Sequence, residues 1–326
     1  MKSLGLNRYA LALGVAAALL AGCGVASQSF APAGSPSVAQ HRGIAGPIRS
    51  DASKKGLLYI STLDNGLEMY AWPSLAPVGF VSAAGVPLGL CVDATGDIWV
   101  PMNDSLIWEF AHGGYAPIRQ LLDNYGLPGS CSSDPTTGNL AAGSYFGASS
   151  GPGNVLVYKK ARRGPAVFAL PDRSQCFSVA YDSEGNLFAN GIDANGRPIL
   201  AELSKGKRSF ERVSVPLGVG RPGSLQWDGK YLAEQDADTN VIYQFKVSNA
   251  VAIIKGLTML QLGGYSNQLW ITGGTKRHPQ GTAVIGTNYA YYGFSVWKYP
   301  SGGDPQAVVY GVASSPEGVT VSPDKP

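Results

Sequence analysis

Beyond Gly56 the chain alternates short hydrophobic runs with polar turns that are rich in Gly, Asp and Asn. In residues 87–110, PLGLCVDATGDIWVPMNDSLIWEF, the turns DATGD and NDS separate the apolar runs. Residues 175–203 and 221–245 repeat the same order of runs and turns. Short runs of alternating polarity bounded by such turns predict antiparallel strands joined by tight hairpins. The pattern therefore predicts an all-β fold.

A glycine, or a residue in its place, marks the first turn of each unit at a regular interval. The positions are Gly56, Gly96, Gly138, Gly185, Gly229 and the region near Asn267. The interval of about 40 to 47 residues is long enough for four strands and matches the period of a β-propeller blade. The sequence thus predicts six blades of four antiparallel strands each.

The first and last units complement each other. No apolar run that would serve as an inner strand precedes Leu57–Ile60, whereas the C-terminal residues SPEGVTVSPDKP look like an inner strand with no blade behind it. Placing Gly318–Ser322 beside Leu57–Ile60 would close the ring and remove exposed sheet edges. We therefore expect one six-bladed β-propeller domain over residues 56–326, closed by a C-terminal inner strand.

The segments LYISTLDNGLEMYAWP, DIWVPMNDSLIWEF and YLAEQDADTNVIYQF resemble the blade core of NHL-type propellers. The resemblance implies an architecture and no particular activity. The last blade departs most, because a partly basic segment at Gly273–Tyr292 is expected to be inserted between its second and third strands.

Propellers of the related SMP-30 (gluconolactonase) type hold a divalent cation on the ring axis with Glu, Asn and Asp side chains. By resemblance, this implies a metal-dependent hydrolase with an ion such as Ca²⁺ as an alternative function. The inner-strand positions that can be aligned do not offer that ligand set. The densest acidic cluster, Glu234, Asp236 and Asp238, is expected in a turn between strands two and three. No catalytic residue is assigned, and the metal content stays unknown.

The N-terminus has the features of an export signal. Lys2 and Arg8 precede the apolar stretch Tyr9–Gly22, which is too short to span a bilayer. The tetrapeptide ending at Cys23, LAGC, resembles the lipobox of bacterial lipoproteins. The resemblance implies a signal peptide over 1–22 and attachment of acyl chains such as palmitate to Cys23, which would anchor the protein to a membrane.

Residues 23–55 are rich in Ala, Ser, Pro and Gly and predict a flexible, disordered tether. Gly24 stands where the inner-membrane retention signal of enteric bacteria has Asp, so the expected location is the bacterial cell envelope, with the outer membrane favoured over the inner.

Composition supports the fold and excludes one class of partner. Charged residues make up 14% of the chain and glycines number 43, about twice the usual share, which suits a turn-rich β protein. The net charge is +3 with no clustered Lys or Arg run, so nucleic acid is not an expected partner.

Besides Cys23, the sequence contains three cysteines. Cys91, Cys131 and Cys176 fall in or just before inner strands of consecutive blades. In an oxidising envelope compartment two of these cysteines could form a disulfide, either Cys91–Cys131 or Cys131–Cys176. The leading expectation is that all three are small, buried free thiols. A catalytic cysteine would need a histidine base. His41 falls in the predicted tether and His112 and His278 fall in predicted loops, so a Cys–His pair is not expected.

Ligand-binding candidates gather at the mouth of the ring. The loops that lead into the inner strands are expected to converge there, at residues 84–89, 128–131, 173–177, 220–224 and 314–318. The inserted segment is expected to cover one face with aromatic and cationic side chains suited to a glycan or a protein partner. These candidates are Arg277, His278, Tyr289, Tyr291 and Tyr292. The sequence favours a lipid-anchored binding module, with a purely structural envelope lipoprotein as a further alternative.

Overall fold

The computed structural model describes residues 56–64, 66–147, 151–162, 164–216, 219–262, 266–288, 292–312 and 315–324. The predicted signal peptide, Cys23 and the tether lie outside these residues. Among the described residues, no helix is both long and apolar enough to cross a membrane.

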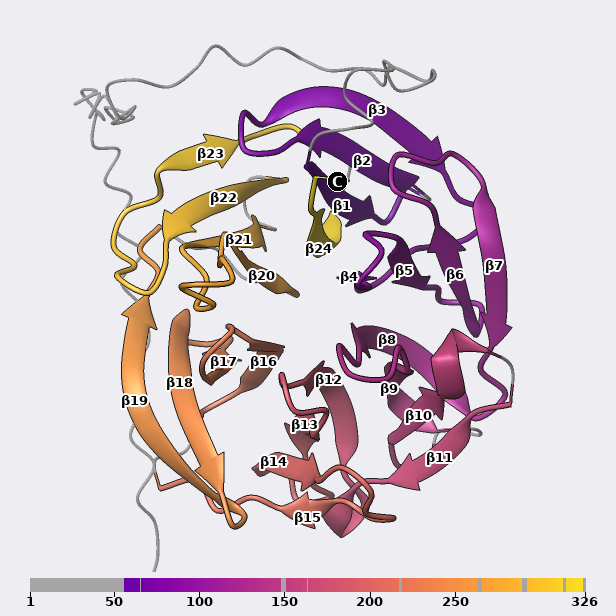
Figure 1. Ribbon diagram of the computed structural model, residues 1–326, viewed down its shortest axis with the longest axis vertical. Coiled ribbons are helices and arrows are strands. Elements are labelled where there is room, and N and C mark those ends of the chain that lie inside the picture. The colour runs from indigo at the N-terminus through magenta and orange to yellow at the C-terminus, as the bar shows by residue number, and fades with distance from the viewer. Residues whose placement is uncertain are drawn as a thin grey trace, which may run out of the picture. The chain divides into compact units, whose positions relative to one another are not determined.

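The described residues form six four-stranded antiparallel sheets arranged around a common axis (Figure 1). The predicted six-bladed β-propeller is therefore confirmed. From the axis outward, the strands of blades 1 to 3 are β24 (Pro316–Ser322), β1 (Leu57–Thr62), β2 (Gly66–Ala71) and β3 (Ala76–Ser82); β4 (Cys91–Val92), β5 (Ile98–Pro101), β6 (Leu106–Phe110) and β7 (Pro117–Leu122); and β8 (Gly126–Ser133), β9 (Leu140–Gly147), β10 (Asn154–Tyr158) and β11 (Ala166–Ala169).

Blades 4 to 6 follow the same order. Their strands are β12 (Gln175–Tyr181), β13 (Leu187–Ile192), β14 (Pro198–Leu203) and β15 (Glu211–Arg212); β16 (Pro222–Trp227), β17 (Leu232–Asp236), β18 (Val241–Ser248) and β19 (Val251–Met259); and β20 (Leu269–Thr272), β21 (Ala283–Asn288), β22 (Gly293–Lys298) and β23 (Ala307–Val309).

The two ends of the domain meet in blade 1, as the sequence predicts. β24 pairs antiparallel with β1, with Leu57 opposite Ser322 and Ile60 opposite Val319. Val319 is fully buried, so the last strand is part of the core. The closing strand thus completes the blade that the N-terminal part of the domain leaves with three strands.

The first hairpin of a blade is fixed by a short local motif. Asp182 accepts hydrogen bonds from the backbone N–H groups of Glu184 and Asn186, both 2.9 Å, and Gly185 adopts φ +88°. A side-chain acceptor at the first position and a residue that tolerates positive φ define this kind of turn. Asp93, Asp134 and Asp228 hold the corresponding positions in blades 2, 3 and 5 and accept backbone N–H groups in the same way.

The position expected for the first turn of the sixth blade is wrong. Asn267 does not mark its first turn, since it precedes the inner strand β20, and the turn begins at Gly273 with φ +89°. The predicted insertion Gly273–Tyr292 contains a whole strand, β21, with five of its six residues buried. This strand is hard to recognise in sequence because glycine-rich and tyrosine-rich segments flank it and its central Gly286 weakens the apolar pattern.

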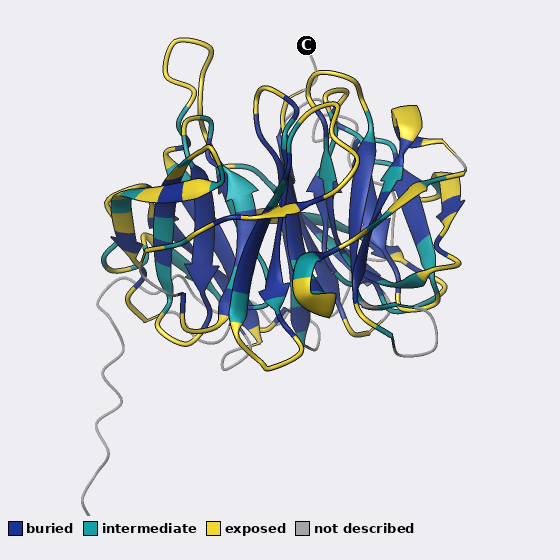
Figure 2. Cartoon of the chain, turned by 90° about the horizontal axis from the view of Figure 1, so that it is seen from below, coloured by how far each residue is buried: buried dark blue, intermediate teal, exposed yellow. Residues whose placement is uncertain are grey.

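The core lies between the blades. One cluster packs Leu57 and Met69 of blade 1 against Ile98, Val100 and Trp108 of blade 2. Figure 2 shows this arrangement from the side, with buried strands in the middle and exposed loops on both faces. Each sheet therefore buries both of its faces, as expected for radially packed blades.

Side chains near the axis join neighbouring inner strands. The Gln226 amide exchanges two hydrogen bonds with the backbone of Ile271, 2.9 and 2.6 Å long, and so links blades 5 and 6. The Gln268 amide of blade 6 exchanges two with Leu90 of blade 2 and accepts a third from the N–H of Val319 in β24, at 3.1 Å. These contacts hold the closing strand between its neighbours.

Candidate functional site

The two faces of the ring carry different loops. We call the face where the inner strands begin the entry face; it also carries the hairpins between second and third strands, such as 193–197 and 237–240. We call the opposite face, which carries the first hairpins at Asp93, Asp134, Asp182 and Asp228, the turn face. A ligand that approaches the axis from the entry face meets the starts of the inner strands.

Three consecutive inner strands carry a β-bulge at their entry-face end. The pairing register shifts around Gly129 in β8, around Phe177 in β12 and between Pro222 and Leu225 in β16. A bulge inserts an unpaired residue and re-aims side chains. The bulge in β12 depends on Gly191 opposite it, because a Cβ there would lie 1.8 Å from the carbonyl oxygen of Gln175.

The bulges help to shape a cavity of about 530 Å³ on the entry face, which we call the vestibule. Its residues come from blades 3 to 6 and include Gly129, Tyr145, Phe177, Arg221, Asp238 and Asn267. Phe177 stacks on Tyr145 with ring centroids 5.0 Å apart and planes 6° from parallel. Its volume falls in the range of about 300–1,000 Å³ usual for ligand sites.

A narrower cavity of about 190 Å³ continues the vestibule along the axis. We call it the axial pocket. Gly129, Phe177 and Asn267 line both cavities. All six blades contribute to it, and the residues are Leu88, Gly89, Gly129, Ser130, Phe177, Ser178, Ser224, Asn267, Gln268 and Glu317. The structure therefore brings the five predicted mouth loops together around one cavity.

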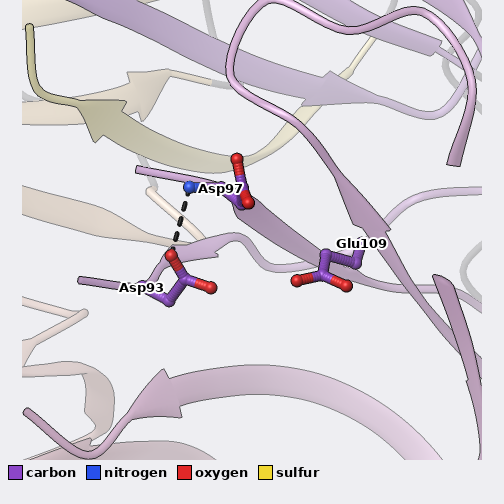
Figure 3. A group of neighbouring side chains, drawn as sticks. All are labelled: Asp93, Asp97 and Glu109. Atoms are coloured by element: carbon purple, nitrogen blue, oxygen red, sulfur yellow. Dashed lines mark hydrogen bonds between the residues drawn. The ribbon is translucent and has the colours of Figure 1, made fainter. Parts of the chain in front are cut away.

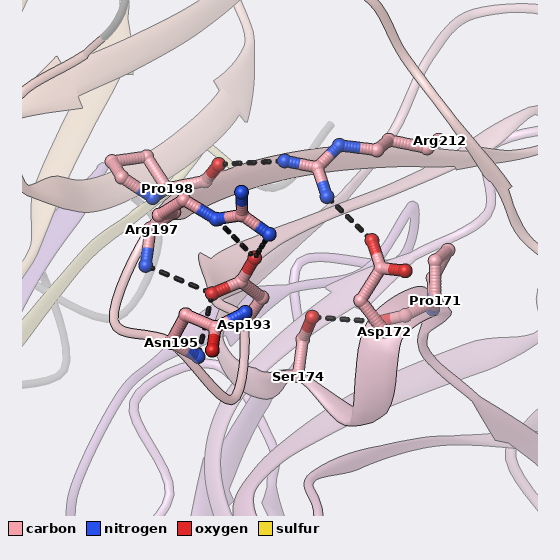
Figure 4. Close-up of polar contacts among 8 residues, drawn as sticks. All are labelled: Pro171, Asp172, Ser174, Asp193, Asn195, Arg197, Pro198 and Arg212. Carbon is pink, nitrogen blue, oxygen red and sulfur yellow. Dashed lines mark hydrogen bonds and ion pairs between the residues drawn. The ribbon is translucent and has the colours of Figure 1, made fainter.

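The hairpin that follows β13 forms part of the vestibule wall. Asp193 accepts the backbone N–H groups of Asn195 and Arg197 at 2.8 and 3.0 Å, and the Arg197 guanidinium pairs with the same carboxylate at 2.9 Å (Figure 4). The backbone hydrogen bond from Arg197 in particular lowers the pKa of Asp193. Ile192 and Gly196, which line the vestibule, belong to this braced hairpin.

The lining of the axial pocket does not fit the divalent-cation site of SMP-30-type propellers. Among the described lining residues it offers a single carboxylate, Glu317, together with the amides of Asn267 and Gln268. The Gln268 amide is engaged with backbone groups of Leu90 and Val319. A Ca²⁺ ion takes about six to eight oxygen ligands, usually including several carboxylates.

Three carboxylates converge elsewhere, in blade 2. Oxygens of Asp93, Asp97 and Glu109 lie within 4.8 Å of one another (Figure 3). Asp93 accepts the N–H of Asp97 at 3.1 Å, and Arg119 pairs with Glu109 at 3.2 Å. Burial raises the pKa of Glu109, and the nearby Arg119 opposes this shift. The cluster has oxygen donors of the type Ca²⁺ takes, and in this structure it braces the first hairpin of blade 2.

The three candidate residues of the predicted insertion that the structure describes, Arg277, His278 and Tyr292, lie on two different faces. Arg277 and His278 lie on the turn face, where Gly281 N–H and the Gln280 amide bond to Asp228 at 2.7 and 3.1 Å. Tyr292 follows β21 and lies at the entry face, 55% exposed. Tyr289 and Tyr291 are outside the described residues. The length of β21, about 3.3 Å per residue, separates the two groups.

The acidic cluster of blade 5 also differs from expectation. Glu234 and Asp236 are buried in strand β17, and only Asp238 lies in the following turn. Asp236 accepts the N–H groups of Gly220 and Asp238, both at 3.0 Å. The expected turn begins later because the second strand continues through these polar residues.

The three cysteines within the described residues form one disulfide and one free thiol. Cys91 and Cys131 form a disulfide between β4 and β8, with their Cα atoms 5.6 Å apart. Cys176 is a buried free thiol, and burial raises its pKa to about 12. A thiol held in its neutral form is a poor nucleophile.

No family model matches the chain, and no curated protein sequence matches it. Solved structures do resemble it. A chain from the nidogen/laminin complex is 12% identical with a TM-score of 0.64, over 83% of this chain and 100% of that one. The β-propeller domain of Cps50 (Swd1) from Myceliophteria thermophila is 11% identical with a TM-score of 0.56, over 83% of this chain and 88% of that one.

At these identities the likeness shows the fold alone. Fold and site together define a six-bladed β-propeller with a vestibule and an axial pocket on its entry face. The sequence analysis did not identify Tyr145 as a site residue, and it placed Glu317 in a mouth loop, at residues 314–318, without singling it out. Their only sequence signals were an aromatic residue in a second strand and a charge at the start of an inner strand, and neither distinguishes a ligand contact from a surface residue.

Proposed function

We propose that this protein is a lipid-anchored binding module of a bacterial cell envelope, whose ligand docks on the entry face. The vestibule with its stacked Tyr145 and Phe177 is the observation that carries the proposal. A rigid aromatic surface beside polar and charged groups suits a sugar ring or a protein side chain. The likeness to a chain from a complex of two proteins, nidogen and laminin, supports a protein partner.

Ligand binding at the entry face can be tested by ligand-observed NMR on the full chain carrying Cys23→Ala. The ligands to be screened are envelope mono- and disaccharides and short peptides. We expect Phe177→Ala to weaken the binders at least tenfold, because their stacking surface is lost. Tyr115→Ala is the matched control, since this aromatic residue is 41% exposed in the loop between β6 and β7, on the turn face. Binders affected equally by both variants would place the site elsewhere, and a screen without binders would favour a purely structural lipoprotein.

Lipid anchoring rests on the resemblance of LAGC to a lipobox and on the apolar stretch before it. Several acyl chains at about 0.8 kcal/mol per buried CH₂ give stable attachment. We expect Cys23→Ala to move the protein from the membrane fraction to the soluble fraction and to abolish incorporation of labelled palmitate. Cys176→Ala, which alters a buried thiol, should leave both unchanged. Retention of the Cys23→Ala protein in membranes would contradict the anchor.

A further inference from the structure

A further cavity, of about 450 Å³, lies between blades 4 and 5, and we call it the lateral pocket. It forms because the chain leaves blade 4 early. β15 pairs with β14 only at Ala201 and Glu202. Beyond Arg212 the backbone crosses to blade 5, where Ser214 forms two backbone hydrogen bonds, both 2.8 Å long, at the start of β19. No described strand therefore covers the first residues of β14, and a gap opens between the two blades.

Valine side chains form the apolar part of the lateral pocket. Val213 and Val219 line it, are 2% and 4% exposed, and belong to the hydrophobic cluster between blades 4 and 5. Val215 also lines it and packs against the same cluster. The guanidinium of Arg212, another lining residue, pairs with Asp172 (Figure 4). The cation of the pocket is therefore already balanced by an acid.

Glu234 is the acidic residue that lines the lateral pocket. It is 2% exposed, and its Oε1 accepts a hydrogen bond from the Asn190 amide at 2.9 Å. That amide also donates to the carbonyl of Gly223 at 3.1 Å. Among the described residues, no other hydrogen bond and no salt bridge to Glu234 is present. A carboxylate can accept about four hydrogen bonds, so the ionised Glu234 lacks donors at the pocket.

A second acid makes this end of the pocket more negative. Asp236 lies two residues further along β17 and is 4% exposed. Its carboxylate accepts the N–H of Gly220, which lines the pocket, at 3.0 Å. No salt bridge to Asp236 is present in the described part of the chain. An opposite charge within about 4–6 Å would stabilise the ionised Glu234.

We propose that the lateral pocket binds an aliphatic primary amine, with the ammonium group against Glu234 and the hydrocarbon part against the three valines. An ammonium group has three donors, no acceptor and a positive charge, so it supplies what the carboxylate lacks. The volume of the pocket falls in the range of about 300–1,000 Å³ usual for small ligands. This site is separate from the vestibule, and it does not depend on the proposed function of the entry face.

Binding at this site is coupled to a proton. Burial, and to a smaller extent the Asp236 carboxylate, raises the pKa of Glu234 to about 7 in the free protein. The ammonium group favours the ionised form, so the bound amine displaces the proton of Glu234. The other charged groups at the pocket are Asp236 and Arg212. The affinity for the amine should therefore rise as the pH rises through 7.

The test measures binding of cyclohexylmethylamine to the full chain carrying Cys23→Ala by calorimetry. Cyclohexylmethanol is the matched neutral probe, which keeps the ring and loses the charge. At pH 8 we expect the amine to bind at least tenfold more tightly than the alcohol. At pH 6 its affinity should be about tenfold lower, with release of about 0.8 proton per amine, measured in buffers of different ionisation enthalpy.

Two substitutions locate the site. Glu234→Gln should remove both the preference for the amine and its pH dependence, whereas Glu184→Gln, which changes an exposed acid, should remove neither. Val215→Phe should weaken amine and alcohol together at least tenfold, because the larger side chain fills the pocket. Val167→Phe is its matched control, since Val167 is 43% exposed on β11 of blade 3.

The outcomes decide the inference. If amine and alcohol bind equally, or if the amine keeps its advantage in Glu234→Gln, the pairing with Glu234 is wrong. If neither probe binds, or if Phe177→Ala weakens the amine as much as Val215→Phe does, the lateral pocket is not its site. Each of these results overturns the inference, and the saccharide and peptide screen of the entry face still decides the proposed function. Urea unfolding of Glu234→Gln and Val215→Phe confirms that both variants are folded.

A second arm decides where the ammonium group comes from. Nα-acetyl-lysine amide represents a lysine side chain of a protein, and acetylated norleucine amide is its neutral counterpart. A Glu234-dependent gain for the lysine derivative identifies a protein source. A gain for cyclohexylmethylamine alone identifies a small free amine, and a gain for neither overturns the inference.

Discussion

At the residue scale, Glu234 is a buried carboxyl group at the interface of blades 4 and 5. It is 2% exposed, and its Oε1 accepts a hydrogen bond from Asn190 Nδ2 at 2.9 Å. No salt bridge to it is present among the described residues. Burial raises the pKa of Glu234 to about 7, because removal from water disfavours the ionised form. The folded protein therefore retains a proton at this site that the unfolded chain has already released near neutral pH.

This difference predicts a pH-dependent stability. Between about pH 4.5 and 7 the folded state binds more protons than the unfolded state, so the free energy of unfolding falls as pH rises through this window. Above it the ionised Glu234 costs about 3 kcal/mol. We expect Glu234→Gln, which cannot ionise, to gain about that much stability relative to wild type between pH 5 and pH 8 in urea unfolding.

Glu184→Gln serves as the control for this comparison, because Glu184 is an exposed acid. It should follow the wild-type pH dependence. A Glu234→Gln variant whose stability changes with pH as the wild type does would show that Glu234 is ionised at no cost in the folded protein.

At the element scale, the inner strands decide how blades are joined. β4 has only two residues, yet it lies between the closing strand and β8. The Cys91–Cys131 disulfide ties this short strand to blade 3 across a sequence separation of 40 residues. Closing a loop of that length stabilises a protein by about 4 kcal/mol in the chain-entropy model.

We expect the double variant Cys91→Ala, Cys131→Ala to lose about 4 kcal/mol of unfolding free energy and to become insensitive to reductant. Cys176→Ala should keep the reductant sensitivity of the wild type, because Cys176 is outside the bridge. Peptide mapping under non-reducing conditions checks the pairing directly. A linked Cys131–Cys176 peptide, or rapid alkylation of Cys91 in the folded protein, would contradict it.

At the scale of the whole molecule, a single strand closes the ring. β24 supplies the inner strand of blade 1, and its Val319 and Val321 are 0% and 4% exposed. Without it, β1 would become an open sheet edge, and the neighbouring faces of blades 6 and 1 would meet solvent. Each buried side chain of this size contributes about 1.5–3 kcal/mol.

Deletion of residues 316–326 should therefore abolish cooperative thermal unfolding and lead to aggregation, measured by calorimetry and size-exclusion chromatography. Deletion of residues 325 and 326 alone leaves β24 intact and should preserve the transition. A chain lacking β24 that still unfolds cooperatively near the wild-type temperature would show that the ring does not depend on closure.

The sequence by itself determined the strands, their grouping into six blades and the closing strand. These features follow from local rules, because a turn such as Asp182–Gly185 and an alternating apolar run carry their own conformational preference. Where the local pattern was weak, as at Gly286 in β21, the prediction failed. Tertiary structure alone decided the vestibule, the axial pocket and the burial of Glu234. Each depends on residues from different blades that meet around the axis, and on bulges whose direction is set by packing against the neighbouring sheet.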